Sequence, residues 1–525
     1  MLGNEKACCE IQDYVDYFKN WSSEIKPLAK LFRTNQYGYI YDTATGKVMQ
    51  CEDLQYEILE GLLNCSIDEV INNLRKQYEE QRIVVAMEGI KDAIENENIL
   101  KSIKVDNFYS PGHYEFLDRM INSELEQIML ELTERCNLRC GYCIYNDNYK
   151  QTRNHGSQDM TKEIARAAID YAAVHGSTSK GLAVTFYGGE PLLKYDLLKD
   201  CIEYAQRIVK EKKLSFSLTT NLVLVTREIA KYLASVEDLS IVCSLDGPED
   251  MHNDYRKDIH GNGSFQKAIQ GLRYLIEEFG DNAADRMNLS MVFTPPYTFE
   301  KINRINDFFN KLDWLPKKVG KFVTYPTPGS IDDGMAGSEY KEKIGNIIME
   351  NTLGQWSEDE YFNKLSQNED IDFFTKRGVE DLLTRIHKRG IYKDAIDRFP
   401  LNGCCVPGSR KIYVTTKGDF NLCERVSGAP SIGNVYTGID FQRIKSTFVD
   451  EYSSAAREHC LSCWAINFCS VCYENCYTDN KLDMDKKNTE CEYARYNILK
   501  KLVHYHRCIE ENAQGLQYLD DIIIS

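Results

Sequence analysis

The chain has 525 residues with 43% hydrophobic content, and its 63 basic and 80 acidic residues give a net charge of −17. Such a length buries at least one large core and predicts two or three domains. The acidic excess argues against a nucleic-acid-binding protein, because contacts to phosphates need clustered positive charge. No segment approaches the ~20 apolar residues of a membrane span, and no export signal is recognisable near Met1. We therefore expect a cytoplasmic protein that binds neither nucleic acid nor membrane.

The first expected domain covers residues 1–110. Residues 37–41 and 47–51 are β-prone runs joined by a short turn, which predicts a hairpin, and amphipathic helices are expected at 54–63 and 68–78. A hairpin followed by helices is typical of a winged-helix-like arrangement. Its exposed strand edge can accept a peptide as one more strand. The alternative is a cap that only shields the next domain.

Residues 120–326 alternate between strands and helices. Apolar alternation before Cys136 predicts a first strand around 128–132. Further strands are expected at 183–187, 214–219, 239–244, 289–294 and 321–325, and helices at 161–175, 195–212, 226–235, 264–279 and 299–312. Because each return between parallel strands needs a crossover, this order predicts an α/β fold with a parallel sheet. Ligand-binding loops then gather at the carboxyl ends of the strands.

Three cysteines follow the first of these strands. Cys136, Cys140 and Cys143 have the spacing Cys-x3-Cys-x2-Cys. Three such thiolates hold three irons of a 4Fe-4S cubane and leave the fourth iron without a protein ligand, so that it is open to a further ligand. A zinc knuckle is the alternative, but zinc takes four ligands and no fourth Cys or His follows nearby.

Polar residues also end later strands of this region. The run Gly188-Gly189-Glu190-Pro191 follows an apolar strand. Paired glycines let backbone carbonyls approach a ligand, and a glutamate can receive an ammonium group. Taken alone, this run would be an ordinary strand and turn. Other strand ends, and the loops after them, supply Thr220, Asn221, Ser244, Asp246 and Arg256.

Together these motifs, with Tyr142 before the last cysteine, resemble the radical S-adenosylmethionine (SAM) superfamily. The resemblance implies an incomplete six-unit barrel, a partial (β/α)6 fold, in which the methionine moiety of SAM chelates the open iron. It implies that the glycine–glutamate run grips the amino group of SAM, and that Ser244, Asp246 and Arg256 contact its ribose and carboxylate. A structural turn is the alternative for Asp246 and Arg256. The implied cofactor-binding residues are Tyr142, Gly188, Gly189, Glu190, Pro191, Thr220, Asn221, Ser244, Asp246 and Arg256.

A second group of cysteines lies between residues 404 and 491. Adjacent residues rarely both point at one metal, so these nine cysteines supply eight independent ligand positions. Eight thiolates are what two fully ligated 4Fe-4S clusters require. A pair of zinc sites is the alternative. The nine are Cys404, Cys405, Cys423, Cys460, Cys463, Cys469, Cys472, Cys476 and Cys491.

The layout of this group resembles the SPASM extension of radical SAM enzymes. Gly418 precedes Cys423 with the spacing G-x4-C, and Tyr473 stands where the family pattern has a cysteine. Whether Cys472, Cys476 or both replace that cysteine is therefore open, as is full ligation of the inner cluster. The implied outer-cluster ligands are Cys460, Cys463, Cys469 and Cys491. The implied inner-cluster candidates are Cys404 or Cys405, Cys423, and one or both of Cys472 and Cys476.

Residues 401–495 would form this SPASM domain, between a helical bridge or insertion at 327–400 and a helical tail at 496–525. From end to end the chain is similar to SPASM-type maturases of ribosomally made peptides (RiPPs) that carry a fused amino-terminal peptide-recognition element. The resemblance implies SAM as a cofactor, together with one SAM-binding and two auxiliary 4Fe-4S clusters. It also implies a cysteine-containing precursor peptide as partner, and an electron donor such as flavodoxin or ferredoxin.

The implied activity is reductive cleavage of SAM to a 5′-deoxyadenosyl radical, which takes hydrogen from the peptide and installs thioether crosslinks. Two other outcomes stay open: carbon–carbon or carbon–oxygen crosslinks, and oxidation of a Cys or Ser as in sulfatase maturation. A non-catalytic iron–sulfur carrier is the alternative from a different class. Such a carrier would not need the glycine–glutamate run or Ser244.

Glu424 directly follows Cys423, where sulfatase-maturing relatives carry an aspartate. We interpret Glu424 as a base that removes a proton from a substrate thiol or amide, because a glutamate keeps the carboxylate and changes its reach by one methylene. The alternative is a surface carboxylate paired with Arg425.

Overall fold

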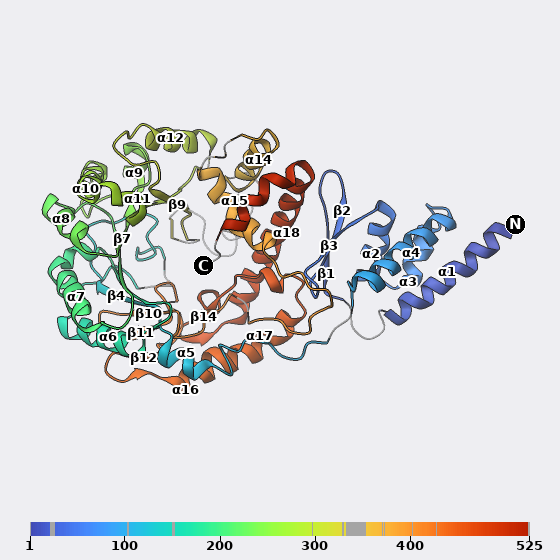
Figure 1. Cartoon of the computed structure of the whole chain (residues 1–525), viewed down its shortest axis with the longest axis horizontal. Coiled ribbons are helices and arrows are strands. Elements are labelled where there is room, and N and C mark those ends of the chain that lie inside the picture. Colours follow the sequence, from blue (N-terminus) through green and yellow to red (C-terminus); the bar gives the residue numbers. More distant parts are fainter. Residues whose placement is uncertain are drawn as a thin grey trace.

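The computed structural model describes residues 2–21, 27–101, 104–149, 153–296, 298–327, 330–331, 353–369, 371, 373–401, 403–426 and 428–522. Figure 1 shows an elongated molecule. A barrel lies at one end, helices of the C-terminal part lie in the middle, and a smaller N-terminal unit lies at the other end. Within the described residues, no helix is both long enough and apolar enough to span a lipid bilayer.

Parallel strands form the wall of the barrel. They follow one another in the sheet in chain order, and each pairs in parallel with the next. All the strands expected in this region are found, and the partial (β/α)6 fold is confirmed. The strands are β4 (Gln127–Thr133), β5 (Leu182–Gly188), β6 (Leu214–Thr220), β7 (Leu239–Ser244), β8 (Met287–Val292) and β9 (Gly320–Thr324).

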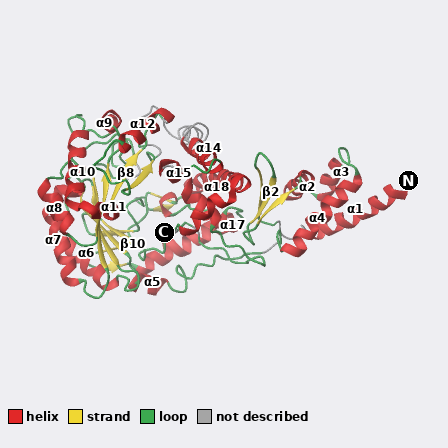
Figure 2. Ribbon diagram, turned by 45° about the horizontal axis from the view of Figure 1, so that its top comes forward, coloured by secondary structure: helices red, strands yellow, loops and turns green. Residues whose placement is uncertain are grey.

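Helices between these strands cover the outside of the sheet (Figure 2). Thr161 and Thr226 begin two of them, because their hydroxyls accept hydrogen bonds from backbone N–H groups of the first turn. The expected long helices are confirmed as α6 (Lys162–His175), α7 (Tyr195–Ile208), α8 (Arg227–Ser235), α10 (Phe265–Phe279) and α12 (Phe299–Asn310). Shorter elements are α5 (Leu117–Ser123), η1 (Pro191–Lys194), α9 (Glu249–Tyr255), η2 (Gly280–Asn282) and α11 (Ala283–Arg286).

The sheet continues beyond β4, which the sequence did not predict. There β10 (Lys411–Val414) pairs in parallel with β4. The strands β11 (Asp419–Asn421), β12 (Gly433–Asn434) and β13 (Gly438–Ile439) follow antiparallel, so the sheet has ten strands. The cysteine-rich region is therefore joined to the barrel through main-chain hydrogen bonds, and one hydrophobic core runs through both.

The N-terminal unit contains a three-stranded antiparallel sheet followed by helices. The predicted hairpin is confirmed as β2 (Gly38–Asp42) and β3 (Val48–Cys51), and the predicted helices as α2 (Asp53–Asn64) and α3 (Ile67–Leu74). Three elements were not predicted: α1 (Leu2–Trp21), β1 (Ala29–Arg33) and α4 (Glu80–Glu97). The third strand makes this a three-stranded sheet rather than an isolated hairpin, and the winged-helix-like arrangement stays a prediction.

The small sheet is a wall shared by two hydrophobic cores. Ile40 is buried in the core formed with α1 to α4, where Leu31 and Met49 also pack. Neighbouring side chains Tyr39 and Tyr41 are buried in a different core that includes the C-terminal helices. This alternation is the period of two that a strand imposes. Both faces of the sheet are therefore covered.

The C-terminal helices include α14 (Leu353–Ser366), α15 (Phe373–His387), α17 (Tyr452–Leu461) and α18 (Met484–Asn512). The helical character expected of 327–400 is confirmed for α14 and α15, while residues 328–329, 332–352, 370 and 372 lie outside the described residues. Helix α18 runs without interruption across the expected boundary at 495/496. The remaining elements are α16 (Phe441–Arg443), η3 (Ile444–Glu451), η4 (Ile466–Phe468), η5 (Tyr473–Asn475), β14 (Tyr477–Thr478), β15 (Lys481–Leu482) and η6 (Ala513–Asp521).

Candidate active site

The loop that carries Cys136, Cys140 and Cys143 begins just after β4 and is held by the segment that follows α9. Arg139 N donates to Lys257 O at 2.7 Å, and Gly141 N donates to Tyr255 O at 2.9 Å. A further isolated bridge joins Leu138 to Asp258. These main-chain contacts fix the backbone between the cysteines, so the spacing of the thiols does not depend on the loop alone.

Burial sets the protonation of the three thiols. Burial raises the pKa of Cys136 to about 11 and that of Cys140 to about 12, and it raises the pKa of Cys143 in the same direction. Arg256 opposes the shift at Cys140 and Cys143, because its positive charge favours a thiolate. Iron binds thiolates, so cluster binding here must release protons.

The glycine–glutamate turn at the end of β5 packs against the start of the cluster loop. Gly189 N donates to Thr133 O at 2.8 Å, and Glu190 N donates to Arg135 O at 3.0 Å. A Cβ on Gly188 would lie 2.3 Å from Thr133 O, and one on Gly189 would lie 2.1 Å from Arg135 O. The glycines are therefore required for this close approach of two backbones. Pro191 then begins η1.

The carboxylate of Glu190 is buried and oriented by three hydrogen bonds. It accepts from Leu192 N at 3.1 Å, from Thr220 Oγ1 at 2.8 Å and from Asn221 N at 2.8 Å. A carboxylate has about four acceptor positions, so about one remains for an added donor. Burial raises the pKa of Glu190 to about 7, and the three hydrogen bonds limit the rise. An ammonium group would supply the missing donor and favour the ionised form.

Thr220 and Asn221 lie at the end of β6, as predicted, and both connect to neighbouring parts of the site. Thr220 holds Glu190, as described above, and is itself buried. The Asn221 side-chain amide donates to Asn137 Oδ1 at 2.8 Å and lies 3.8 Å from Cys136 Sγ. Asn221 thus joins the glutamate to the cluster loop, a link that its position at a strand end did not reveal.

Asp246 and Arg256 form a buried ion pair. Arg256 Nε lies 2.8 Å from Asp246 Oδ2, and both side chains are at least nine-tenths buried. Tyr142 Oη donates to the same Asp246 oxygen at 2.5 Å, and Val292 N donates to the other at 3.0 Å. Burial alone would raise the pKa of Asp246, but the charge and hydrogen bonds of Arg256, together with His252 and Tyr142, outweigh it, so the net shift is downward. The pair thus joins the cluster loop to the segment that follows β7, whose last residue, Ser244, is half-buried; a role of these residues in binding SAM stays a prediction.

A second polar group, which the sequence did not predict, lies on the inner face of the barrel. Glu131 is buried in β4, its Oε1 accepts from Arg153 Nε at 2.8 Å, and its Oε2 accepts from Thr416 N at 3.3 Å. The Arg153 guanidinium lies 4.0 Å from the ring centre of Tyr145. Burial, aided by Tyr145 and Glu131, raises the pKa of Tyr413 far above its usual range. The sequence contained one signal for this group, the charged Glu131 among the apolar residues of β4.

Glu424 lies beside the start of β10 and pairs with Lys411. The Lys411 Nζ lies 3.3 Å and 3.1 Å from the two carboxylate oxygens. Glu424 is therefore paired with Lys411 and not with Arg425, the partner considered from the sequence. Burial, followed by the charge of Glu424, raises the pKa of Tyr187 to about 12. Since Tyr187 belongs to β5, Glu424 lies near the barrel wall, and its side chain is only 17% exposed.

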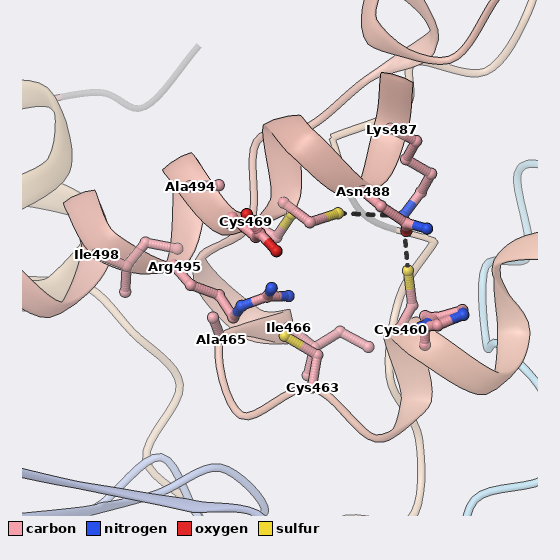
Figure 3. A pocket seen from close by; sticks show the side chains of 13 residues that line it. Cys460, Cys463, Ala465, Ile466, Cys469, Lys487, Asn488, Ala494, Arg495 and Ile498 are labelled. Carbon is pink, nitrogen blue, oxygen red and sulfur yellow. Dashed lines mark hydrogen bonds between the residues drawn. The ribbon is translucent and has the colours of Figure 1, made fainter. Parts of the chain in front are cut away.

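Four cysteines of the C-terminal group line one cavity of about 270 Å³ between α17, η4 and α18 (Figure 3). They are Cys460, Cys463, Cys469 and Cys491, the set expected to hold the outer cluster. The cavity is several times larger than the ~30 Å³ that one water occupies. Donor set and space thus fit a cubane.

Five other cysteines gather around a second position. Burial raises the pKa of Cys472 to about 11, with further contributions from Glu474, Cys423 and Cys405. Cys476 is fully buried, and its Sγ donates to Cys472 O at 3.1 Å. Burial also raises the pKa of Cys404, and Cys476, Cys472 and Cys405 add to the rise. The inner-cluster candidates are therefore neighbours, and the choice among them stays open.

Within the described part of the chain, no three His, Cys, Asp or Glu side chains converge closely enough to share a single metal ion. In a cubane each thiolate binds its own iron, so the sulfurs of a cluster site need not meet at one point. The cysteines from Cys51 to Cys508 are all free thiols.

Residues 130–309 match the family model described as the radical SAM superfamily. This chain contains a radical SAM domain. The matched segment covers the cluster loop, the glycine–glutamate turn and the Asp246–Arg256 pair. The segment that holds these candidate site residues is therefore the radical SAM domain.

The radical SAM domain and its flanks resemble two curated enzymes. The cysteine-type anaerobic sulfatase-maturating enzyme of Clostridium novyi is 22% identical over 367 residues, which cover 67% of this chain and 87% of that enzyme. The radical SAM cyclopropyl synthase TigE of Paramaledivibacter caminithermalis is 24% identical over 332 residues, which cover 55% of this chain and 68% of TigE.

A solved structure resembles the fold over most of the chain. Native anSMEcpe with bound AdoMet and the Kp18Cys peptide has a TM-score of 0.53 and 20% identity, and the match covers 76% of this chain and 99% of that one. The arrangement of barrel and C-terminal cysteine-rich region is thus a fold that also occurs in a SAM- and peptide-bound enzyme.

Proposed function

We propose that this radical SAM enzyme is a maturase of a ribosomally made peptide and that it installs cysteine thioether crosslinks. The observation that carries the proposal is the buried Glu190, which has a vacant acceptor position beside the three cysteines of the cluster loop. That arrangement suits the ammonium group of SAM next to an iron without a protein thiol.

The residues of the chain hold and orient the cofactors. When bound, the cluster and SAM supply a 5′-deoxyadenosyl radical able to take hydrogen from an unactivated carbon. Glu190 orients the amino group, and the glycine turn and the Asp246–Arg256 pair keep the loop in place. The barrel wall keeps water away from the reacting carbon, which matters because a misplaced radical would be quenched.

The N-terminal unit is the proposed binding site for the precursor peptide. Within the described residues β3 pairs only with β2, so its outer edge can take one more strand. The sheet also contacts the segment between Cys463 and Cys469, called the outer cysteine loop below. Thr43 Oγ1 donates to Trp464 O at 2.8 Å, and Asn467 Nδ2 donates to Thr43 O at 2.8 Å. A peptide bound there would start close to the auxiliary region.

The two C-terminal cysteine groups are the proposed sites of two auxiliary 4Fe-4S clusters. Closing a thioether removes two hydrogens from the peptide. One leaves as a hydrogen atom, the other as a proton, and one electron must also leave the peptide. The auxiliary clusters are the proposed acceptors of that electron. A flavodoxin or ferredoxin would then take the electron from the protein, and the same class of carrier would supply the electron that starts the reaction.

Glu424 is the proposed base for the proton. Its carboxylate is oriented by Lys411 and lies near Tyr187 of the barrel strand β5. To accept a proton from a substrate thiol, one Glu424 oxygen must exchange its contact with Lys411 for the thiol. Until then the ammonium of Lys411 lies against both carboxylate oxygens.

Co-expression with short cysteine-containing peptides encoded beside its gene tests the proposed function. We expect mass spectrometry to find a peptide that loses two hydrogens per link and one alkylatable thiol per link. A loss of hydrogens with all thiols still alkylatable would instead support carbon–carbon or carbon–oxygen crosslinks, the first of which is the bond type named for TigE. An aldehyde trapped by a hydrazide would support sulfatase-type oxidation of Cys or Ser.

A further inference from the structure

A buried lysine lies among the thiols of the outer cysteine group, and none of the motifs above includes it. Lys487 is in the first turn of α18 and is 1% exposed. Its Nζ lies 3.3 Å from Cys460 Sγ and 3.4 Å from Cys491 Sγ (Figure 3). The spacing of four between Lys487 and Cys491 puts both on one face of the helix.

The surroundings of Lys487 leave its positive charge without an ordinary partner. Burial of an ammonium costs several kcal/mol unless an opposite charge compensates it. Among the described residues, no carboxylate forms an ion pair with Lys487, and neutral sulfur is a weak acceptor. Thiolates bound to iron would compensate the charge, because a 4Fe-4S core with four thiolates carries a net negative charge.

Among the described residues, no buried cation is hydrogen-bonded to an inner-group sulfur: the charge of Lys487 also acts on Cys476, but its two N–H···S contacts are to Cys460 and Cys491 of the outer group. Arg410 Nη1 lies 3.9 Å from Cys405 Sγ, but Arg410 is exposed and therefore screened by water. Lys411 lies near Cys423, but its charge is paired with Glu424 at 3.1 Å. Of the two cysteine groups, the outer one thus has the unscreened positive charge.

We propose that Lys487 is a positioning residue that raises the reduction potential of the outer auxiliary cluster, so that this cluster is reduced before the inner one. Reduction adds one electron, and thus one negative charge, to the cluster. A fixed ammonium with two N–H···S contacts stabilises the reduced form more than the oxidised form. The inference rests on the proposed assignment of Cys460, Cys463, Cys469 and Cys491 to that cluster.

The test is a dithionite titration followed by EPR on the anaerobically reconstituted full chain. Lys487→Met removes charge and donors, Lys487→Gln removes only the charge, and Lys487→Arg keeps both. We expect the midpoint of the outer cluster to move to lower potential in Lys487→Met and Lys487→Gln, and to stay near wild type in Lys487→Arg. Lys486→Gln is the matched control, because the Lys486 Nζ donates to the carbonyls of Glu474 and Tyr477 rather than to sulfur.

Unchanged midpoints in Lys487→Met and Lys487→Gln at full iron content would overturn the proposal. If both neutral variants fail to assemble the outer cluster, the wild-type titration decides, because an inner cluster that is reduced first contradicts the proposed order. The underlying assignment has a separate test: Cys463→Ala must lower the iron content. Retained iron in that variant would refute the assignment itself, whatever Lys487 does.

Discussion

The SAM-cluster loop and the C-terminal cysteine group hold their thiols in different ways. In the loop, three cysteines lie within eight residues and are clamped by main-chain hydrogen bonds from two neighbouring segments. In the C-terminal group, the four outer cysteines come from separate elements: Cys460 from α17, Cys463 from the turn after α17, Cys469 from the position after η4, and Cys491 from α18. Packing of these elements brings the four cysteines together around one cavity. The loop is therefore arranged by local structure, whereas the outer site depends on tertiary packing and is expected to gain stability from its metal.

The largest expected effect separates the two regions by their chemistry. Cys463→Ala combined with Cys469→Ala should remove the outer cluster, about four irons per chain, and abolish peptide product. SAM cleavage should persist, because the cluster loop is untouched. Iron analysis and 5′-deoxyadenosine assay check this. Cys243→Ala is the control, since Cys243 is a fully buried core residue of β7 outside both groups. Loss of SAM cleavage in the double variant would contradict the independence of the two regions.

The clamp on the loop predicts a large stability effect. Arg256→Met leaves Asp246 buried and unpaired, so the free energy of unfolding should fall by about 3–5 kcal/mol. Chemical denaturation with matched cluster content measures it. Arg304→Met is the control: Arg304 pairs with Asp250 at the surface, where such pairs contribute about 0–1 kcal/mol. Equal losses in both variants would mean that the buried pair does not hold the loop.

Glu424 tests whether the cysteine-rich region takes part in chemistry on the peptide. Glu424→Gln should slow formation of crosslinked peptide by about 10²-fold, as expected when a general base is removed. Cleavage of SAM without peptide modification should continue at the wild-type rate. Glu126→Gln is a control, because Glu126 is also ion-paired with a lysine, Lys180, but away from the cysteines. A parallel loss of both activities would count against a role as base.

The loop region also predicts a pH dependence. Glu190, with its pKa raised to about 7, must be ionised to receive the ammonium of SAM. Below pH 7 binding has to expel a proton from Glu190, so the affinity for SAM should fall by about tenfold for each pH unit; it should be level only between pH 7 and the pKa of the SAM amino group, about 7.7–8.0 for an α-amino group. Calorimetry between pH 5.5 and 8.5 checks this at ~0.5-unit steps. Glu190→Gln should bind SAM weakly with no such slope; a persisting slope would place the titrating group elsewhere.

The smallest expected effect concerns the contact between the N-terminal sheet and the outer cysteine loop. Thr43→Val removes one hydrogen bond to Trp464 O, worth about 1 kcal/mol. The temperature at which the auxiliary cluster absorbance is lost should therefore fall by a few degrees. Thr34→Val is the matched control, since Thr34 joins the same sheet to Glu510 of α18 rather than to a cysteine loop. Identical temperature shifts in Thr43→Val and Thr34→Val would show that both substitutions only weaken the contact of the N-terminal sheet with the C-terminal part, without a specific effect on the cysteine loop.

The barrel was predictable from sequence because its signals are local. Each strand is a short apolar run followed by a turn, each helix has an apolar face, and parallel order follows from their alternation. Cys136, Gly188 and Asp246 could be placed at one rim for the same reason. Their partners could not: the contacts of Tyr142 with Asp246 and of Thr220 with Glu190 join residues 104 and 30 positions apart.

The unpredicted elements are those that form through packing against other parts of the fold. The strand β10 is a four-residue run that becomes a strand because β4 offers an open edge about 280 residues earlier in the chain. The strand β1 and the helix α4 are likewise completed by packing within the N-terminal core. Lys487 carried one readable signal, its i,i+4 spacing to Cys491, but its burial follows from the packing of α18 against segments that are distant in sequence.

The most direct test of the account is SAM cleavage by the anaerobically reconstituted protein with dithionite. A cluster that keeps one iron free of protein thiols predicts 5′-deoxyadenosine from the wild type and none from Cys140→Ala, whose C-terminal cysteines are intact. A wild-type protein with full iron content that yields no 5′-deoxyadenosine, or a Cys140→Ala variant that yields as much as wild type, would contradict it.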